Sequence, residues 1–131
     1  MHTAPAMPFR RHVEKYLDAL LDVPGGEVLV HGGRRITAAR FCSLAYRTAS
    51  ALRLRGVGPR QGVTLLGGNL PELLAARYAA GLLGCRVSQL HTVPAAEVQS
   101  AIVRDVETSA LIVDQRFAQR AGDIADMAGV G

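Results

Sequence analysis

The chain has 131 residues, of which 49% are hydrophobic and 20% charged. This composition excludes a disordered tail, a collagen-like chain and a coiled coil, and the length is typical of one domain, residues 1–131. The formal net charge is +4, but the arginines occur singly or in pairs and are not interleaved with aromatic residues. This distribution favours solvated helix faces over a nucleic-acid-binding surface, so we expect no nucleic-acid partner.

Neither secretion nor membrane insertion is predicted. Residues 1–9 contain two prolines and no apolar signal-peptide core, and no run approaches the ~20 apolar residues that span a bilayer. The two cysteines, Cys42 and Cys85, lie in apolar stretches without disulfide or metal-site spacing, and the four histidines are scattered. We therefore expect a cytoplasmic protein with buried thiols, no metal site and no membrane partner.

The N-terminal part is expected to form a helix and a β-hairpin. Residues 8–22 have apolar side chains at helical spacing, and a Pro-Gly-Gly sequence at 24–26 ends the helix. The apolar positions of this helix are Phe9, Val13, Tyr16 or Leu17, and Leu20 or Leu21. Residues 27–31 and 34–37 are short strand-like runs around Gly32-Gly33, which is a hairpin signal. A phosphate-binding loop at this Gly-Gly pair is disfavoured because no helix opens directly after it.

A longer helix is predicted over residues 38–55, with Thr37 as its N-cap. Its apolar stripe consists of Phe41, Leu44, Ala45, Ala49 and Leu52. The sequence Gly-Val-Gly-Pro at 56–59 then stops the helix.

The glycines of residues 56–62 resemble a dinucleotide fingerprint, but their spacing is one residue too long. They also follow a helix and precede a strand, the reverse of the fingerprint's order, so we interpret them as a helix stop and a tight turn.

The second half alternates strands and helices. The expected strands are residues 63–66, 86–90 and 110–113, and the expected helices are residues 71–83, 94–106 and 116–127. Residues 71–83 are apolar almost all round, as in a helix buried on most sides. In residues 94–106 the predicted buried face consists of Val98, Ala101, Ile102 and Val106.

Strands separated by helices of this length imply βαβ crossovers. Their continuous apolar character fits a parallel sheet covered on both faces. The predicted fold class is therefore α/β, an open parallel sheet over residues 38–131 with a helix and hairpin added at residues 8–37.

One segment lies where open α/β sheets bind ligands. Residues 67–72, Gly-Gly-Asn-Leu-Pro-Glu, follow the first parallel strand and open a helix, a position that can attract anions. The favoured alternative is a helix cap, with Asn69 as N-cap, Pro71 in the first turn and Glu72 at the positive dipole end. His91 also follows a strand, but a lone histidine is more often structural. No catalytic, cofactor-binding or metal-binding residue is assigned.

The order of these segments resembles the N-terminal subdomain of adenylate-forming (AMP-binding) enzymes of the acyl-CoA synthetase and ligase type. Two stretches carry the resemblance: ITAARFCSLAYRTASALRLRGVGPRQGVTLLGGNLPELLAARYAAGLLGCRVSQL and VPAAEVQSAIVRDVETSALIVD. They are similar to the family's capped helix and GVGPGD turn, its PNSPEF segment with the following apolar helix, and its PAEELAYILEDSGAKALI segment. The departures are Gly67-Gly68-Asn69-Leu70-Pro71 in place of PNSP, and Thr92-Val93 in place of N-P-R.

The resemblance implies an ATP-dependent acid–thiol ligase whose sheet is the flavodoxin-like half of a larger N-domain. Such enzymes form an acyl-adenylate with Mg-ATP and pass the acyl group to coenzyme A or a carrier pantetheine, in fatty-acid, aryl-acid or secondary metabolism. The family's phosphate loop ending in P-K-G and its C-terminal lysine have no counterpart among these residues, because the one lysine is Lys15. We therefore expect no bound cofactor and no catalysis from the chain alone.

The expected partner is the remainder of a ligase chain, of which residues 1–131 would be an N-terminal piece. A second copy covering the apolar edge of the open sheet is the other expected partner. Two alternatives remain open from the residues: a non-catalytic binding or interaction module derived from the same subdomain, and an unrelated flavodoxin-like nucleotide binder.

Overall fold

The computed structural model describes residues 8–130, and side chains from residue 12 onward. The expectations for residues 1–7 and for the Phe9 side chain lie outside this range. The elements are α1 (Pro8–Leu21), β1 (Glu27–His31), β2 (Arg34–Thr37), α2 (Ala38–Leu54), β3 (Gly62–Leu66), α3 (Pro71–Leu82), β4 (Arg86–Leu90), α4 (Ala96–Asp105), β5 (Thr108–Val113), η1 (Gln115–Phe117) and α5 (Ala118–Ala128). The predicted order of helices and strands is confirmed.

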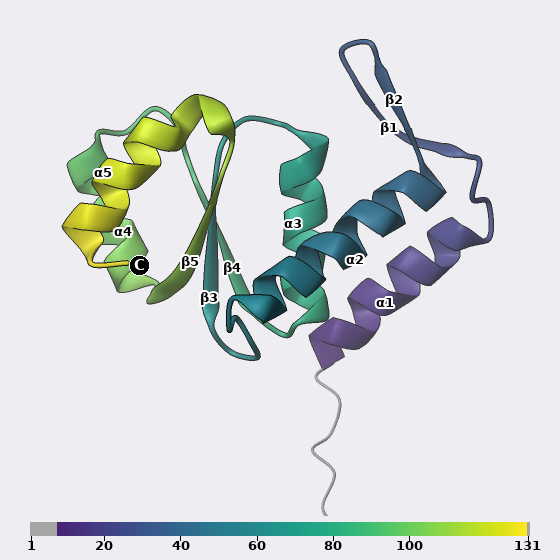
Figure 1. Cartoon of the computed structure of the whole chain (residues 1–131), viewed down its shortest axis with the longest axis horizontal. Coiled ribbons are helices and arrows are strands. Elements are labelled where there is room, and N and C mark those ends of the chain that lie inside the picture. The colour runs from purple at the N-terminus through teal and green to yellow at the C-terminus, as the bar shows by residue number, and fades with distance from the viewer. Residues whose placement is uncertain (1–7, 131) are drawn as a thin grey trace, which may run out of the picture.

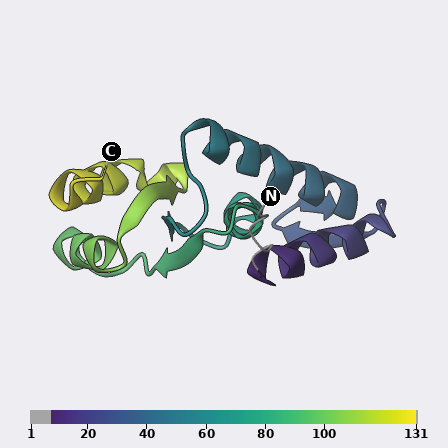
Figure 2. The same cartoon turned by 90° about the horizontal axis from the view of Figure 1, so that it is seen from below.

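The molecule is layered around a parallel sheet of strand order β4-β3-β5. Helix α3 covers one face of the sheet, and α4 and α5 lie together against the other (Figures 1 and 2). The chain steps from β3 to β4 and then returns across β3 to β5, so right-handed crossovers put α3 and α4 on opposite faces. Helices α1 and α2 pack outside α3, and the β1–β2 hairpin extends beyond them. The predicted fold class is therefore confirmed.

Strand β3 is the centre of the sheet and is buried throughout. It pairs in parallel with β4 from Gly62↔Arg86 to Leu66↔Leu90, and with β5 on its other side. Val63 and Leu65 belong to a core cluster with α1, α2 and α3, whereas Leu66 belongs to a second, smaller cluster with α4 and α5. Because successive side chains point to opposite faces of a strand, β3 contributes one face to each of the two clusters.

A side-chain cap and two glycines with positive φ set the boundaries of the hairpin and of α2. The Thr37 hydroxyl accepts a hydrogen bond of 3.2 Å from the backbone N–H of Arg40, the cap predicted for α2. Gly56, with φ of 84°, ends that helix in the left-handed region. Gly32 has φ of 59° at the hairpin turn, which is the conformation that a type II′ turn requires at its first central residue. In α1, Val13 and Leu17 are buried, whereas Tyr16 is exposed.

The predicted buried face of α4 is wrong. Val98 and Ile102 are 51% and 39% exposed, Ala101 is also exposed, and Val106 is half-buried. The buried residues of this helix are Gln99, Ser100 and Val103. The cause is hydrogen bonding: the Gln99 amide donates to the carbonyl oxygen of His91 at 2.6 Å and accepts from Arg120 of α5 at 3.0 Å. These bonds fix the rotation of α4 about its axis and leave its apolar stripe facing outward.

Two other helix boundaries differ from the prediction. Residues 94 and 95 precede α4 instead of forming its first turn, and the last helix begins with the 3-10 turn η1. The Asp114 carboxylate accepts a hydrogen bond from the backbone N–H of Arg116 at 3.1 Å, which caps this tight turn. No helix among the described residues is long and apolar enough to cross a membrane.

Candidate functional site

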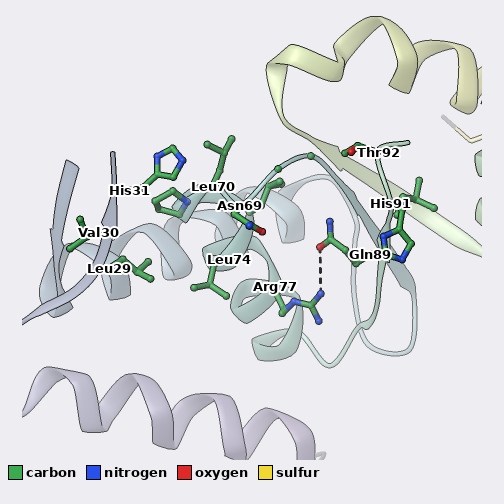
Figure 3. A pocket seen from close by; sticks show the side chains of 15 residues that line it. Leu29, Val30, His31, Asn69, Leu70, Leu74, Arg77, Gln89, His91 and Thr92 are labelled. Atoms are coloured by element: carbon green, nitrogen blue, oxygen red, sulfur yellow. Dashed lines mark hydrogen bonds between the residues drawn. The ribbon is translucent and has the colours of Figure 1, made fainter. Parts of the chain in front are cut away.

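A cavity of about 690 Å³ lies at the carboxyl ends of β3 and β4, against the hairpin and the start of α3. This volume is in the usual range for small-molecule pockets, and the position is the one where open α/β sheets bind ligands. Its walls combine apolar side chains of the hairpin and α3 with polar groups at the strand ends (Figure 3). The lining residues are Leu29, Val30, His31, Gly67, Gly68, Asn69, Leu70, Pro71, Leu73, Leu74, Arg77, Gln89, Leu90, His91 and Thr92.

The cap predicted for α3 is wrong in one residue. Leu70, not Asn69, is the N-cap, and it makes no side-chain cap hydrogen bond. A tight turn, in which the Leu70 N–H donates to the Gly68 carbonyl at 2.9 Å, shifts the helix start and leaves Asn69 exposed on the cavity wall. Pro71 is in the first turn, as predicted.

Glu72 connects the start of α3 to the hairpin. Its carboxylate lies 2.8 Å from the Arg34 guanidinium of β2. Partial desolvation raises the pKa of Glu72, but hydrogen bonds from its own backbone N–H and from Arg34, with the charges of Arg34 and His31, lower it overall. The Glu72 carboxylate already lies at the positive end of the α3 dipole. This observation supports the helix-cap interpretation and argues against a bound anion at the same place.

The cavity has a cationic character. No aspartate or glutamate is among the described residues that line it. Arg77 of α3 is exposed and donates a weak hydrogen bond of 3.4 Å to the Gln89 side chain, which leaves its charge without a carboxylate partner in the described part of the chain. His31 and His91 lie at opposite ends of the cavity (Figure 3). Arg77 is therefore the one permanently charged side chain among the described lining residues, and the other polar side chains can both donate and accept hydrogen bonds.

His91 has a structural role through its backbone. Its carbonyl oxygen accepts the 2.6 Å hydrogen bond from Gln99 that anchors α4, while its side chain is exposed. No contact between the two histidine rings is present in the described structure. The sequence pattern did not single out His31, Arg77 or Gln89, since they come from the separate elements β1, α3 and β4, which the fold brings around one cavity.

The crevice between the ends of β3 and β5 contains a buried carboxylate that the sequence interpretation left without a role. Asp114 accepts hydrogen bonds from the Arg116 guanidinium at 2.9 and 2.7 Å, and from the backbone N–H of Gly68. The side-chain hydrogen bonds of Arg116 are the main cause that holds the pKa of Asp114 below its usual value. The signal for this contact was an aspartate directly after the apolar strand β5.

We expect Asp114→Asn to reduce the acid sensitivity of the fold. The carboxylate has a lower pKa folded than unfolded, so it stabilises the fold above the unfolded pKa of about 3.9, and this stabilisation is lost as the pH falls through the folded pKa. Urea unfolding from about pH 6 to about pH 2.5 should show a smaller loss of stability for the variant than for the natural chain. Asp105→Asn, at an exposed residue, controls for the charge change, and equal acid sensitivity of D114N and the natural chain would contradict the prediction.

The remaining reactive groups form no catalytic cluster. Cys42 and Cys85 are buried and free, as predicted, and desolvation raises the pKa of each thiol. Their sulfurs donate to the carbonyl oxygens of Leu17 and Gly58 at 3.4 and 3.2 Å. Among the described residues, no three His, Cys, Asp or Glu side chains are placed to hold a metal ion.

The fold and the sequence together define the class of protein. The family model described as AMP-binding enzyme matches residues 17–129. The chain therefore belongs to the AMP-binding enzyme family, as the resemblance predicted.

The curated relatives are CoA ligases. An indoleacetate–CoA ligase of Aromatoleum aromaticum is 34% identical over 94 residues, covering 72% of this chain and 18% of the relative. An acetate/butyrate–CoA ligase of Arabidopsis thaliana is 26% identical over 100 residues, covering 76% of this chain and 18% of the relative. The chain thus spans about a fifth of the length of these relatives.

Solved structures agree with the fold. The amide bond synthetase McbA of Marinactinospora thermotolerans matches with a TM-score of 0.80 and 26% identity, over 95% of this chain and 24% of that protein. A benzoate CoA ligase of Burkholderia xenovorans matches with a TM-score of 0.83 over 95% of this chain and 25% of that protein; at 19% identity it supports the fold alone.

Proposed function

We propose that this chain is the leading part of a cytoplasmic, AMP-forming acid–thiol ligase. In that reaction a carboxylate attacks the α-phosphorus of ATP and releases pyrophosphate, and a thiol of coenzyme A or a carrier pantetheine then attacks the acyl carbon and releases AMP. The family match over residues 17–129 carries the proposal. The 34% identical indoleacetate–CoA ligase supports an acid and coenzyme A as substrates.

The residues of this chain serve the proposed ligase as a scaffold. Mg-ATP needs a phosphate-binding loop and a lysine, and the one lysine, Lys15, is an exposed residue of α1, a helix outside α3. At the end of β3, Gly67 and Gly68 lie close to Asp114 and Arg116, which supports the proposal that the nucleotide-binding groups come from another part of the ligase. In this proposal the part of the ligase beyond residue 131 supplies the nucleotide-binding groups, and the isolated chain is inactive.

The proposal is tested by acid-dependent pyrophosphate release. We expect none from the 131-residue chain with ATP, Mg²⁺ and indoleacetate, butyrate or benzoate. The longer product read from the same gene past codon 131 should release pyrophosphate with at least one such acid. Lys15→Ala in that longer product is the control and should retain the activity.

Two outcomes would contradict the proposal. Pyrophosphate release by the 131-residue chain alone would show that it carries its own catalytic groups. A stop codon directly after Gly131 would remove the ligase and favour the alternative, a non-catalytic binding module derived from this subdomain.

A further inference from the structure

Two turns at the amino-terminal end of the sheet have an unusual backbone. Arg60 has φ of 67° and Glu107 has φ of 53°, and they are the non-glycine residues of the described chain with positive φ. Arg60 lies in the turn before β3, and Glu107 lies between α4 and β5. A residue with a Cβ atom is disfavoured in this left-handed region, where glycine is the usual residue. Other contacts must therefore hold the two turns in place.

One guanidinium binds carbonyl groups of both turns. Arg86, the first residue of β4, donates from its Nε to the carbonyl oxygen of Arg60 at 3.0 Å. Its Nη1 donates to the carbonyl oxygen of Val106 at 2.9 Å, and its Nη2 donates a weaker hydrogen bond of 3.4 Å to that of Glu107. In the described part of the chain, no carboxylate lies within ion-pair distance of Arg86. The partners of its guanidinium there are backbone carbonyls.

The first residue of β3 leaves room for this contact. Gly62 pairs with Arg86 of β4 on one side and with Thr108 of β5 on the other. A Cβ atom at Gly62 would lie 2.6 Å from the carbonyl oxygen of Glu107 and 3.3 Å from Nη2 of Arg86. Glycine at this position therefore allows the guanidinium and the α4–β5 turn to approach the start of β3.

Both the charge and the shape of the arginine side chain suit this position. Val106 is the C-cap of α4, and the free carbonyl groups at the end of a helix carry partial negative charge. The positive charge of Arg86 is therefore favourable there. Its N–H donors are fixed in a planar fork, so one side chain can bind two separate chain segments at once. A lysine would keep the charge but lose the fork.

We propose that Arg86 is a conformational latch. Its guanidinium holds the turn before β3 and the turn between α4 and β5 in their left-handed conformations and joins both turns to β4. The latch thereby fixes the amino-terminal ends of the three parallel strands relative to one another. The proposal does not depend on the ligase function, since the cavity lies at the opposite, carboxyl-terminal ends of β3 and β4.

Amide hydrogen exchange of the 131-residue chain tests the latch. The backbone N–H groups of Gln61 and Glu107 each donate a hydrogen bond within one of the two turns. In Arg86→Lys and in Arg86→Met, both amides should lose about tenfold in protection, because each turn loses a hydrogen bond from a charged donor. The Gly56 amide reports on the turn after α2, to which Arg86 donates no hydrogen bond, and its protection should change by less than about twofold.

Glycine substitutions separate the latch from a general loss of stability. Glycine adopts the left-handed conformation without the Cβ penalty, so each turn should hold without the guanidinium once its own strained residue is replaced. Adding Glu107→Gly to Arg86→Met should return the protection of residue 107 to within about threefold of the natural value and leave Gln61 unprotected. Adding Arg60→Gly instead should restore Gln61 and leave residue 107 unprotected.

Matched variants and the folding of the chain complete the test. Arg47→Lys and Arg47→Met make the same replacements at an exposed arginine of α2 and should leave all three protection factors unchanged. Natural protection in Arg86→Lys would overturn the proposal, and so would a single glycine substitution that rescues both turns or neither. If Arg86→Met does not fold, adding both glycine substitutions should recover the circular dichroism of the natural chain. An unfolded triple variant would also overturn the proposal.

Discussion

Replacing Gly67 by alanine is expected to destabilise the fold by about 2–3 kcal/mol, within the usual cost of overpacking a dense core. The glycine follows β3 where the chain passes between β5 and α3. A Cβ atom there would lie 2.5 Å from the Cβ of Asp114 and 2.5 Å from the Cδ1 of Leu73. Leu73 can adjust by rotating, but the Cβ of Asp114 moves only with its backbone, which Leu66 holds through a 2.9 Å hydrogen bond. Urea unfolding measures the loss.

Two other glycines provide controls for this substitution. At Gly68 a Cβ would meet the Arg116 guanidinium at 2.7 Å, the far end of an exposed and flexible side chain, so Gly68→Ala should cost less than Gly67→Ala. At Gly122 in α5 a Cβ has no neighbour within 4 Å, and Gly122→Ala should stabilise the helix by about 0.5–1 kcal/mol. A Gly67→Ala chain as stable as the natural one would show that the β3–β5 crevice is looser than the structure indicates.

Truncating Leu66 to alanine is expected to cost about 2–5 kcal/mol, a large part of the stability of a domain this size. Leu66 is fully buried in the smaller cluster, whose other buried members are Leu90, Val103, Ala121 and Ile124. With so few members, this cluster has little capacity to close around a cavity. Unfolding monitored by circular dichroism in urea would give the difference in free energy.

Leu54→Ala is the matched control for Leu66→Ala. Leu54 ends α2 and is 89% exposed, so the same deletion there should change the free energy of unfolding by less than about 0.5 kcal/mol. Equal losses for the two variants would contradict the assignment of Leu66 to a core. A loss in Leu66→Ala confined to signals from α4 and α5 would instead show that the second cluster unfolds separately.

The fold was largely predictable because its signals are local. Continuous apolar runs at residues 63–66 and 110–113, helices of the right length between strands, and Gly-Gly at the hairpin each determine one element through neighbouring residues. The strand order was not predicted, because the handedness of the crossovers does not say on which side of β3 the strand β5 lies.

The candidate site was less predictable because its contacts are distant in sequence. The carboxylate of Asp114 receives the Gly68 N–H, which no spacing rule connects to it. The α4 face was predicted wrongly because apolar periodicity takes no account of an amide whose partners, His91 and Arg120, lie 8 and 21 residues away. Asn69 was expected to cap α3 from its residue type, but the turn between Gly68 and Leu70 moved the cap by one position.

Because Gln99 holds α4 in place, the exposed apolar face of this helix can tolerate substitutions in evolution. Since Val98, Ala101 and Ile102 contribute little to the interior, they can be exchanged for other residues at small cost to folding. Gln99 has less freedom, because a residue without an amide would leave the His91 carbonyl without this donor and would remove one of the two acceptors of the Arg120 guanidinium, the other being the Pro94 carbonyl. The helix thus combines one side chain that fixes its orientation with an outward face whose residues can be substituted with little effect on folding.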